Sequence, residues 1–370
     1  MTQKAVCKTA IHESAVPKAA ALVAMSGGVD SSVAASLILN NPAVRSQPGS
    51  CTGFTLRLYD DEGTNGAADN ARAAAEKLDI THRELDFRDI FKNEVILPFI
   101  ETYEAGATPN PCINCNRNIK FAFSLFRENG LNFDIFATGH YAQTEKSGSR
   151  WLLKKAADPK KDQSYVLYSL TQEQLSLCSF PLGSLTKDEV REIARERGLL
   201  NTNSGESQDI CFVPDNDYAA FMERYTGKLY PPGDILDTNG CLLGRHCGHI
   251  RYTLGQRRGL GIALNEPVYV CAKNAAANTV TLGPESALYS KALIADNINL
   301  IACEKLDKPV KLTVKTRYHQ ADHPALVEQT GLYEMHIIFE ENQRALTPGQ
   351  SAVLYDGDIV VGGGVIKQVI

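Results

Sequence analysis

Short apolar runs alternate with amphipathic stretches along the first part of the chain, up to about residue 210. Buried strands are predicted by the runs ALVAM (21–25), GFTLRLY (53–59) and FDIFATG (133–139). The first run leads through a glycine-rich turn into a predicted helix from about Ser31 to Leu39, and the segment 65–79 predicts another. Strands that alternate with helices favour a doubly wound parallel α/β sheet.

The segment TKDEVREIARERGL (186–199) contains its own start and stop signals for a helix. Thr186 and Glu189 have the spacing of a capping box, in which each side chain bonds the backbone of the other residue. Gly198 suits the C-terminal cap, since glycine adopts a left-handed conformation at little steric cost. A helix is therefore predicted between these signals.

The pattern changes near Pro214 and again near Lys291. The stretch between them is rich in turn residues and poor in helical periodicity, whereas the stretch beyond alternates apolar and polar residues, as strands do. An Asp356-Gly357 pair there predicts a hairpin turn. We therefore expect an α/β domain at 1–214, a small middle β-rich module at 215–288 and a C-terminal β-barrel at 289–370.

A chain of 370 residues is too long for one ordinary core, which agrees with several domains. No apolar run approaches the roughly 18 residues that a membrane span needs, and the N-terminal stretch lacks the apolar segment of a secretory signal. The 10 cysteines are spread thinly, which indicates mostly free thiols in a reducing compartment. We therefore expect a cytoplasmic protein.

The net charge of −5 argues against nucleic acid only on average. Between Cys241 and Ala263 there are four arginines and no acidic residue, and from Lys305 to Arg317 there are five basic residues and one acidic. Contacts to phosphate need positive charge locally rather than overall. Either cluster is explained equally well as a solvated surface.

The stretch AMSGGVDSS (24–32) follows a predicted strand and opens a predicted helix. It has neither the lysine of a Walker A loop nor the G-x-G-x-x-G of a dinucleotide-binding fold. Ser26 and Ser31 flank Gly27-Gly28 at the helix start, where bare amides and the helix dipole favour an anion. Asp30 is placed to help hold Mg²⁺. The loop resembles the PP-loop of ATP pyrophosphatases, which adenylate a substrate oxygen and release pyrophosphate; an ordinary glycine turn is the alternative.

The stretch TPNPCINCNRNIKF (108–121) contains two thiols, Cys112 and Cys115, in a C-x-x-C spacing. This spacing occurs in metal clips, redox couples and nucleophiles with a neighbouring thiol. Helical periodicity begins just after it, so Cys115 is expected at or just before a helix N-terminus, beside Arg117 and Lys120. The helix dipole and these cations predict a lowered thiol pKa.

A zinc site needs two more ligands at similar spacing. The nearest dense set, Cys241, His246, Cys247 and His249, lies more than a hundred residues away and matches no common zinc finger. A third thiol, Cys211, stands in GESQDICFV, where the strand-like ICFV predicts a place on a strand edge. A buried core cysteine is the alternative for that residue.

Eight motifs occur in one order along the whole chain, and together they resemble the bacterial tRNA 2-thiouridylases of the MnmA/TrmU family, which place sulfur on C2 of the wobble uridine. Each motif alone is only suggestive, whereas eight in register are specific. They are AMSGGVDSS, TPNPCINCNRNIKF, ATGHYAQ, KKDQSYVLYSL, ESQDICF, YTLGQRRGLGI, TVKTRYHQ and LTPGQSAVLY.

The resemblance implies roles for particular residues. It makes Cys115 the nucleophile and Cys211 the carrier of a persulfide received from a sulfur-relay donor protein, while Cys112 faces the target base. ATP would be bound by Ala24, Met25, Ser26, Gly27, Gly28, Val29, Asp30, Ser31, Leu56 and Gly139. The tRNA would be contacted by Asn110, Pro111, His140, Lys161, Asp162, Gln163, Arg317, Tyr318 and Gln350, the last three of them in the barrel.

The chemistry is coherent on its own terms. Oxygen at C2 of uracil is a poor leaving group, and adenylation converts it into AMP, which a sulfur nucleophile can displace. A second thiol can then release the sulfur and leave a Cys115–Cys211 disulfide for a reductant to reopen.

Cys112 departs from the family pattern, because many members have an aspartate there that is assigned acid/base work. The three cysteines Cys112, Cys115 and Cys211 could instead ligate an iron–sulfur cluster with one iron left open for hydrosulfide. The sequence leaves both modes open.

Three other functions compete with this interpretation. An amidotransferase-type ligase of the PP-loop class needs no thiols, a non-catalytic RNA-binding module needs no nucleotide loop, and neither does a thiol–disulfide oxidoreductase. ATP–pyrophosphate exchange that depends on added tRNA separates all three from a tRNA thiolase.

Overall fold

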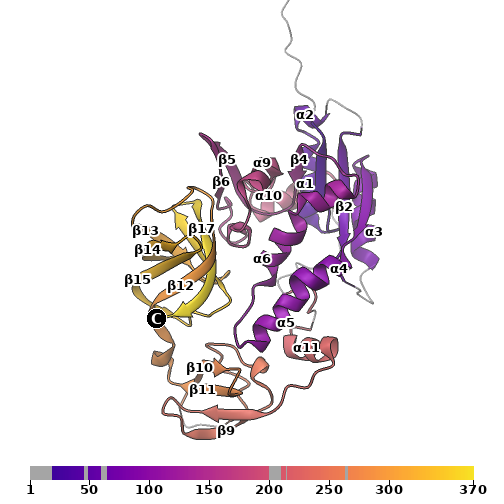
Figure 1. The fold of residues 1–370 in the computed structure, drawn as a ribbon. Helices are drawn as coiled ribbons and strands as arrows, with labels where there is room; N and C mark the ends of the chain where they lie inside the picture. Colours follow the sequence, from indigo (N-terminus) through magenta and orange to yellow (C-terminus); the bar gives the residue numbers. More distant parts are fainter. Residues whose placement is uncertain (1–18, 46–48, 60–64, 200–209, 214, 263–265) are drawn as a thin grey trace, which may run out of the picture.

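A parallel sheet organises the N-terminal half of the protein. The computed structural model describes residues 19–45, 49–59, 65–199, 210–213, 215–262 and 266–370 (Figure 1). The sheet order is β3-β2-β1-β4-β7, with every pairing parallel and β1 at the centre, so the predicted doubly wound sheet is confirmed. Its strands are β1 (Ala21–Ala24), β2 (Cys51–Arg57), β3 (Thr81–Asp86), β4 (Ile135–Ala137) and β7 (Cys178–Ser179).

The two faces of this sheet are covered by different layers, because side chains along a strand alternate between faces. Ala21 and Val23 pack with small residues of α1 and α3, whereas Leu22 joins a larger cluster of aromatic side chains on the other face. Helix α1 extends over Val29–Ile38, two residues earlier at its start than predicted, and α3 over Asn65–Lys77.

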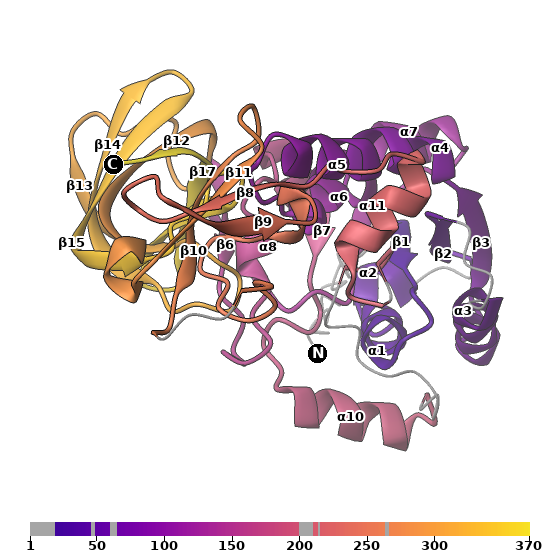
Figure 2. The same cartoon turned by 90° about the horizontal axis from the view of Figure 1, so that it is seen from below.

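Figure 2 shows α4, α5, α6 and α7 on the opposite side of the sheet from α1 and α3. Two of them contain a π-helical turn, labelled η1 and η2, which continues α4 and α6 respectively. The bounds of these and the remaining helices are α2 Pro42–Arg45, α4 Arg88–Phe91, η1 Lys92–Ile96, α5 Leu97–Glu104, α6 Pro111–Cys115, η2 Asn116–Lys120, α7 Phe123–Glu128, α8 Ser164–Leu167, α9 Gln172–Leu177, α10 Lys187–Glu196 and α11 Tyr218–Thr226.

Helix α10 begins and ends as predicted. The Thr186 hydroxyl accepts a hydrogen bond from the Glu189 amide, and the Glu189 carboxylate accepts one from the Thr186 amide, which is the complete capping box. Gly198 has a φ of 61°, the left-handed conformation that ends a helix.

The middle module is a four-stranded sheet in the order β10-β11-β8-β9, with its own core that includes Ile235, Val270 and Val280. Its strands are β8 (Gly233–Leu236), β9 (Leu242–His246), β10 (Tyr269–Asn274) and β11 (Thr279–Gly283). Two 3₁₀ turns, η3 (His249–Arg251) and η4 (Glu285–Leu288), follow β9 and β11.

The C-terminal part is a closed barrel of six strands in the order β12-β15-β14-β13-β16-β17, and pairing of β12 with β17 closes it. The predicted hairpin is present, but its loop residues are Gly357 and Asp358, since Asp356 pairs with Ile359. The strands are β12 (Tyr289–Leu300), β13 (Val310–Lys315), β14 (His323–Gly331), β15 (Glu334–Arg344), β16 (Ser351–Asp356) and β17 (Ile359–Val369).

A hairpin of the α/β part joins the barrel sheet, which the sequence did not indicate. Strands β5 (Gln143–Ser147) and β6 (Arg150–Lys154) pair with each other, and β6 also pairs with β17 through Leu153 and Val360. Arg150 Nε donates to the Ile301 carbonyl at 2.8 Å. The barrel is therefore attached to the α/β domain by a shared sheet (Figure 1).

Candidate active site

A single cavity of about 1490 Å³ collects segments that are distant in sequence. One end is formed by the glycine-rich loop after β1 and by β2, and the other by α6, η2 and the turn at Cys211. The stretch from Pro159 to Gln163 and the stretch from Lys315 to Ala321, at the end of β13, complete the wall. Both the α/β domain and the barrel therefore contribute to it.

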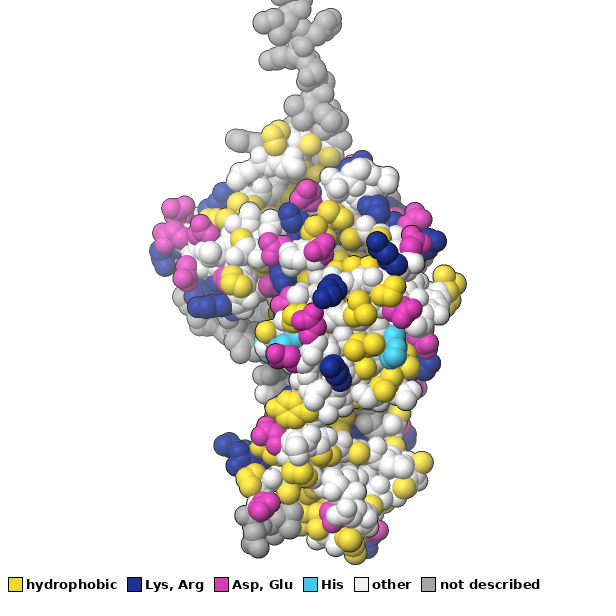
Figure 3. All heavy atoms as spheres, turned by 90° about the vertical axis from the view of Figure 1, so that its left-hand side faces the viewer, with side chains coloured by type: hydrophobic (Ala, Val, Ile, Leu, Met, Phe, Trp, Pro, Cys, Tyr) yellow, Lys and Arg dark blue, Asp and Glu magenta, His cyan; other side chains and the backbone are white. Residues whose placement is uncertain are grey.

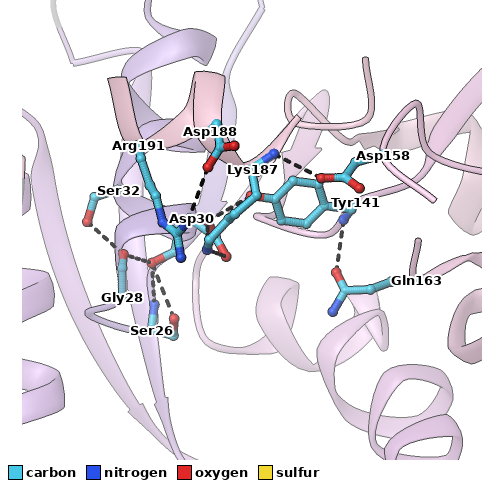
Figure 4. A network of polar contacts seen from close by, with 11 residues as sticks. Ser26, Gly28, Asp30, Ser32, Tyr141, Asp158, Gln163, Lys187, Asp188 and Arg191 are labelled. Carbon is cyan, nitrogen blue, oxygen red and sulfur yellow. Dashed lines mark hydrogen bonds and ion pairs between the residues drawn. The ribbon is translucent and has the colours of Figure 1, made fainter. Parts of the chain in front are cut away.

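The glycine-rich loop is held by its own hydroxyl groups (Figure 4). The Ser26 amide donates to Ser31 Oγ at 3.1 Å, and the hydroxyls of Ser31 and Ser32 each donate to the Gly28 carbonyl at 3.0 Å. Gly27 has a φ of 76°, and a Cβ there would lie 2.1 Å from the Ala67 carbonyl oxygen, so only glycine fits.

The residues assigned to ATP by resemblance lie at this end of the molecule. The cavity is lined by Ala24, Met25, Ser26, Asp30, Ser31, Leu56 and Gly139, whereas Gly27, Gly28 and Val29 are not among its lining residues.

Asp30 is engaged by a lysine that sequence reasoning did not select. Lys187 Nζ, at the start of α10, lies 2.7 Å and 2.8 Å from the two carboxylate oxygens of Asp30, and the Tyr141 hydroxyl donates to one of them at 2.9 Å (Figure 4). A metal ion at Asp30 must therefore compete with a half-buried ion pair. The loop lacks a Walker lysine, but the fold brings Lys187 to its side.

The three thiols lie together, as predicted. Cys112, Cys115 and Cys211 all line the cavity; Cys112 acts electrostatically on the pKa of Cys115, and both of them act on the pKa of Cys211. Cys115 is buried, whereas Cys112 and Cys211 are exposed, and all described cysteines are free thiols. Lys120 lies among them and lines the same cavity.

The predicted surroundings of two thiols are wrong. Cys115 is the last residue of α6 and leads directly into η2, so it has no helix N-terminus beside it. Cys211 lies in a turn rather than on a strand edge, and the ESQD before it lies outside the described residues. Arg117 is exposed, and its charge acts on Tyr168.

The predicted lowering of the thiol pKa is also wrong. Although Cys112 and Cys211 expose part of their surface, the cavity walls around the thiols exclude much of the water; this desolvation raises the pKa of Cys112 and Cys115, and that of Cys211 to about 12. The Lys120 ammonium acts in the opposite direction on all three, but its effect is smaller than that of burial. Burial opposes the charge of Lys120 as well, yet the neighbouring sulfurs leave its pKa above the usual value.

No three His, Cys, Asp or Glu side chains in the described ranges are arranged to hold a metal ion. The three thiols line the same cavity without forming such a group in the described part of the chain. The histidines of the middle module have backbone partners instead of a metal ion. His246 Nδ1 accepts a hydrogen bond from the Gly248 amide, and His249 Nε2 lies 3.2 Å from the Glu104 carbonyl oxygen.

The residues assigned to tRNA fall into two groups. Those lining the cavity are Asn110, Pro111, His140, Lys161, Asp162, Gln163 and Tyr318. Arg317 and Gln350 do not line it: Arg317 donates to the Ala345 carbonyl at 2.9 Å, and Gln350 Nε2 donates to the carbonyls of Thr108 and Pro109.

Several cavity residues in the first group also have structural partners. The Asp162 carboxylate accepts from the amide and hydroxyl of Ser164, and Gln163 Oε1 accepts from the Tyr141 amide at 2.9 Å. Burial lowers the pKa of His140 to about 3, so this imidazole is neutral at physiological pH.

Lys120 and Lys315 are cavity residues that sequence reasoning did not assign. Lys315 Nζ lies 5.8 Å and 5.7 Å from the ring centres of Tyr165 and Tyr318, and burial lowers its pKa. Lys315 belongs to the basic run from Lys305 to Arg317, and this run was the signal in the sequence that could have identified it.

The outer face of the barrel carries basic and acidic side chains interspersed, without a large area of one charge (Figure 3).

A parallel sheet with a serine- and glycine-rich loop opening α1 defines a nucleotide-binding domain of the PP-loop class. Family models match all three parts: the tRNA methyl transferase HUP domain over residues 19–215, the tRNA methyl transferase PRC-barrel domain over 219–284 and the aminomethyltransferase beta-barrel domain over 290–366.

Curated relatives identify the family. The tRNA-specific 2-thiouridylase MnmA of Clostridioides difficile is 44% identical over 358 residues, which are 94% of this chain and 98% of that protein. The protein of the same name from Acetivibrio thermocellus is 45% identical over 359 residues, with the same coverage. The chain therefore belongs to the tRNA-specific 2-thiouridylase family.

Solved structures resemble the fold only distantly. The U34-tRNA thiolase NcsA from Methanococcus maripaludis, with its [4Fe-4S] cluster, is 18% identical with a TM-score of 0.35, covering 56% of this chain and 68% of that one. NMN synthetase from Francisella tularensis is 18% identical with a TM-score of 0.33, covering 57% and 79%. Such distant likenesses have no bearing on the function.

No helix within the described ranges is long and apolar enough to cross a membrane.

Proposed function

We propose that this protein is an ATP-dependent tRNA sulfurtransferase that adenylates the C2 oxygen of the wobble uridine, releases pyrophosphate and installs sulfur at C2. The observation that carries the proposal is the cavity, into which both the glycine-rich loop and the three thiols open. A base that enters this cavity can meet a nucleotide on one side and sulfur on the other. Family membership supports the same reaction.

The loop is suited to hold the triphosphate. No side chain caps the start of α1, and Ser26, Asp30 and Ser31 beside it line the cavity, so the first backbone amides of the helix are donors that phosphate oxygens can use. Mg²⁺ bound with ATP would offset phosphate charge, and Asp30 is the nearest carboxylate in the loop for it. Since Lys187 holds Asp30, nucleotide binding requires this lysine to share or exchange its partner.

Sulfur transfer is assigned to the thiols. A persulfide on Cys211, received from a donor protein, attacks C2; a C–S bond forms, the C2–O bond breaks and its electron pair leaves with AMP. The Cys115 thiolate then attacks the Cys211 sulfur, which releases 2-thiouridine and forms a Cys115–Cys211 disulfide. A dithiol reductant supplies two electrons and two protons to restore both thiols.

The tRNA would approach through the basic rim of the cavity, where Lys160, Lys161 and Lys315 lie. The anticodon loop would place its wobble base inward, between the α/β domain and the barrel. With a tRNA substrate and thiols that must be reduced again after each turnover, we place the protein in the cytoplasm.

Substitution of the thiols tests this proposal. Cys115→Ser and Cys211→Ser should each abolish thiolation, measured by mass spectrometry of tRNA nucleosides, and leave tRNA binding within about twofold. Cys241→Ser is the matched control, because this exposed cysteine lies in the middle module, and it should retain wild-type activity. Wild-type turnover in either active-site variant refutes the assignment.

Nucleotide chemistry separates the competing functions. Wild-type protein should exchange pyrophosphate into ATP only when tRNA is added. Exchange without tRNA would favour another PP-loop ligase, and absence of exchange with intact tRNA binding would favour an RNA-binding module. Iron and sulfide analysis after anaerobic purification tests the cluster alternative: colourless, fully active protein excludes it.

A further inference from the structure

A π-helical turn sets the position of Lys120. The Phe121 amide donates to the Asn116 carbonyl, five residues earlier, at 3.0 Å, and this bond defines η2. In an α-helix, residues five apart are separated by about 500° of rotation, which leaves them about 140° apart around the axis. The wider π turn brings residues five apart towards the same side. Cys115 and Lys120 have this spacing.

The turn therefore aligns three side chains along one side of a continuous helical segment. Cys112 and Cys115 are three residues apart in α6 and share a face, and η2 adds Lys120 to it. All three line the cavity, as does Cys211, whose pKa all three influence. In a regular α-helix the lysine would lie about 140° around the axis from Cys115 and about 80° from Cys112.

Lys120 also lies beside the nucleotide end of the cavity. Its charge acts on His140, and the neighbouring Phe121 ring lies 5.8 Å from the His140 ring. The residue before this histidine, Gly139, approaches the loop so closely that a Cβ would lie 2.9 Å from the Ser31 amide nitrogen. The ammonium is thus located between the thiols and the residues that would hold the α-phosphate.

The ammonium has no acidic counter-ion within the described part of the chain: no carboxylate there lies at ion-pair distance from Lys120. Lys120 is half-buried, and an ammonium that is partly removed from water is costly unless something offsets its charge. Cysteine sulfurs are its only described electrostatic partners of opposite sign, and they are protonated for most of the time because burial raises their pKa. An anion that enters the cavity can therefore offset the charge of Lys120.

We propose that Lys120 is a further catalytic residue, which binds the phosphate of the adenylated uridine and stabilises the negative charge that AMP acquires as sulfur displaces it. The inference rests on the proposed function and adds a residue to it. As the C2–S bond forms and the C2–O bond breaks, the electron pair passes to the phosphate, whose oxygens accept hydrogen bonds from the Lys120 ammonium. The lysine stays charged throughout, so no proton is transferred.

The experiment compares Lys120→Met, which keeps the length and loses the charge, with Lys120→Arg. Two steps are measured separately: tRNA-dependent ATP–pyrophosphate exchange for adenylation, and single-turnover thiolation with a preloaded persulfide. Loss of one preorganised donor to a developing anion typically costs about 10²–10³-fold in rate. We expect the thiolation rate of Lys120→Met to fall by this factor, while its pyrophosphate exchange stays within about threefold of wild type. Adenylated tRNA should therefore accumulate in this variant. Lys120→Arg should recover part of the thiolation rate.

Lys92→Met is the matched control, because Lys92 is an exposed lysine in the other π turn, η1. It should keep both activities. Unchanged thiolation in Lys120→Met overturns the proposal, and so does an equal loss of exchange and thiolation, which would indicate a structural or nucleotide-binding role. If Lys120→Met fails to fold, Lys120→Arg provides the test: this variant must accumulate more adenylated tRNA than the wild type. Absence of exchange in the wild type would instead refute the proposed function itself.

Discussion

Gln350 offers a test of how the barrel acts on the thiols. Its side chain lies in the loop before β16, and Nε2 donates to the carbonyls of Thr108 at 3.1 Å and Pro109 at 2.9 Å. The Thr108 amide in turn donates to the Pro348 carbonyl at 2.9 Å. The barrel thereby holds the segment that leads into Cys112. We expect Gln350→Leu, which keeps the volume and removes the donors, to release this segment.

The size of the effect follows from the two hydrogen bonds. Each contributes about 0.5–1.5 kcal/mol net, so the loss of both should destabilise the closed segment by about 1–3 kcal/mol. For amides that exchange through local opening, this corresponds to about five- to 150-fold faster hydrogen exchange. The measurement is hydrogen–deuterium exchange by mass spectrometry on the peptide that spans residues 106–116, without tRNA.

Gln368→Leu serves as the control, because Gln368 is an exposed glutamine of β17 in the same barrel. It should leave exchange in the Cys112 peptide unchanged. The alternative, suggested by family resemblance, is that Gln350 contacts tRNA directly. If Gln350→Leu left hydrogen exchange in the Cys112 peptide unchanged but weakened tRNA binding, that alternative would be supported. The inference that Gln350 holds the segment before Cys112 would then be refuted.

Further predictions concern the two ends of the cavity. Gly139→Ala should weaken ATP binding at least about tenfold in calorimetry with an unchanged circular dichroism spectrum, because its Cβ would lie 2.9 Å from the Ser31 amide nitrogen. Lys187→Met should lower stability by about 1–2 kcal/mol in thermal denaturation by leaving Asp30 unpaired, and Lys187→Arg should restore most of it. A Cys211 pKa of about 12 means that the thiolate fraction rises about tenfold per pH unit below that value. Alkylation of Cys211 by iodoacetamide, followed by mass spectrometry, should therefore still be accelerating between about pH 8 and about pH 10; a plateau below pH 9 contradicts it.

Local signals in the sequence predicted local structure well. The capping box of Thr186 and Glu189 is present because both of its bonds lie within one helical turn. The loop from Ser26 to Ser31 is present for the same reason, since its glycines and hydroxyls bond each other. The parallel sheet also follows from the alternation of strands and helices, whereas its strand order, with β1 at the centre, was not predicted.

The predictions about Cys115 and Cys211 were wrong because tertiary contacts and an unusual helical turn determine the surroundings of these residues. Helical periodicity after Cys115 was real, but α6 begins before it at Pro111, so the thiol lies at a junction of helical turns rather than at a start. Charged neighbours in sequence predicted a lowered thiol pKa, whereas burial by distant segments raises it. The apolar residues after Cys211 resemble a strand, but Phe212 packs against Phe91 and Phe99 in the core instead.

The shared sheet explains why the cavity needs the barrel. Pairing of β6 with β17 fixes the barrel to the α/β domain, and the loop at Gln350 fixes it a second time beside the segment that leads to the thiols. Two attachments near the two ends of β16 restrict rotation more than either alone, so Lys315 and Tyr318 stay positioned over the cavity. A barrel that only supplied positive charge would need neither attachment. Its place in the wall is better understood as closing the cavity that the glycine-rich loop and the three thiols line.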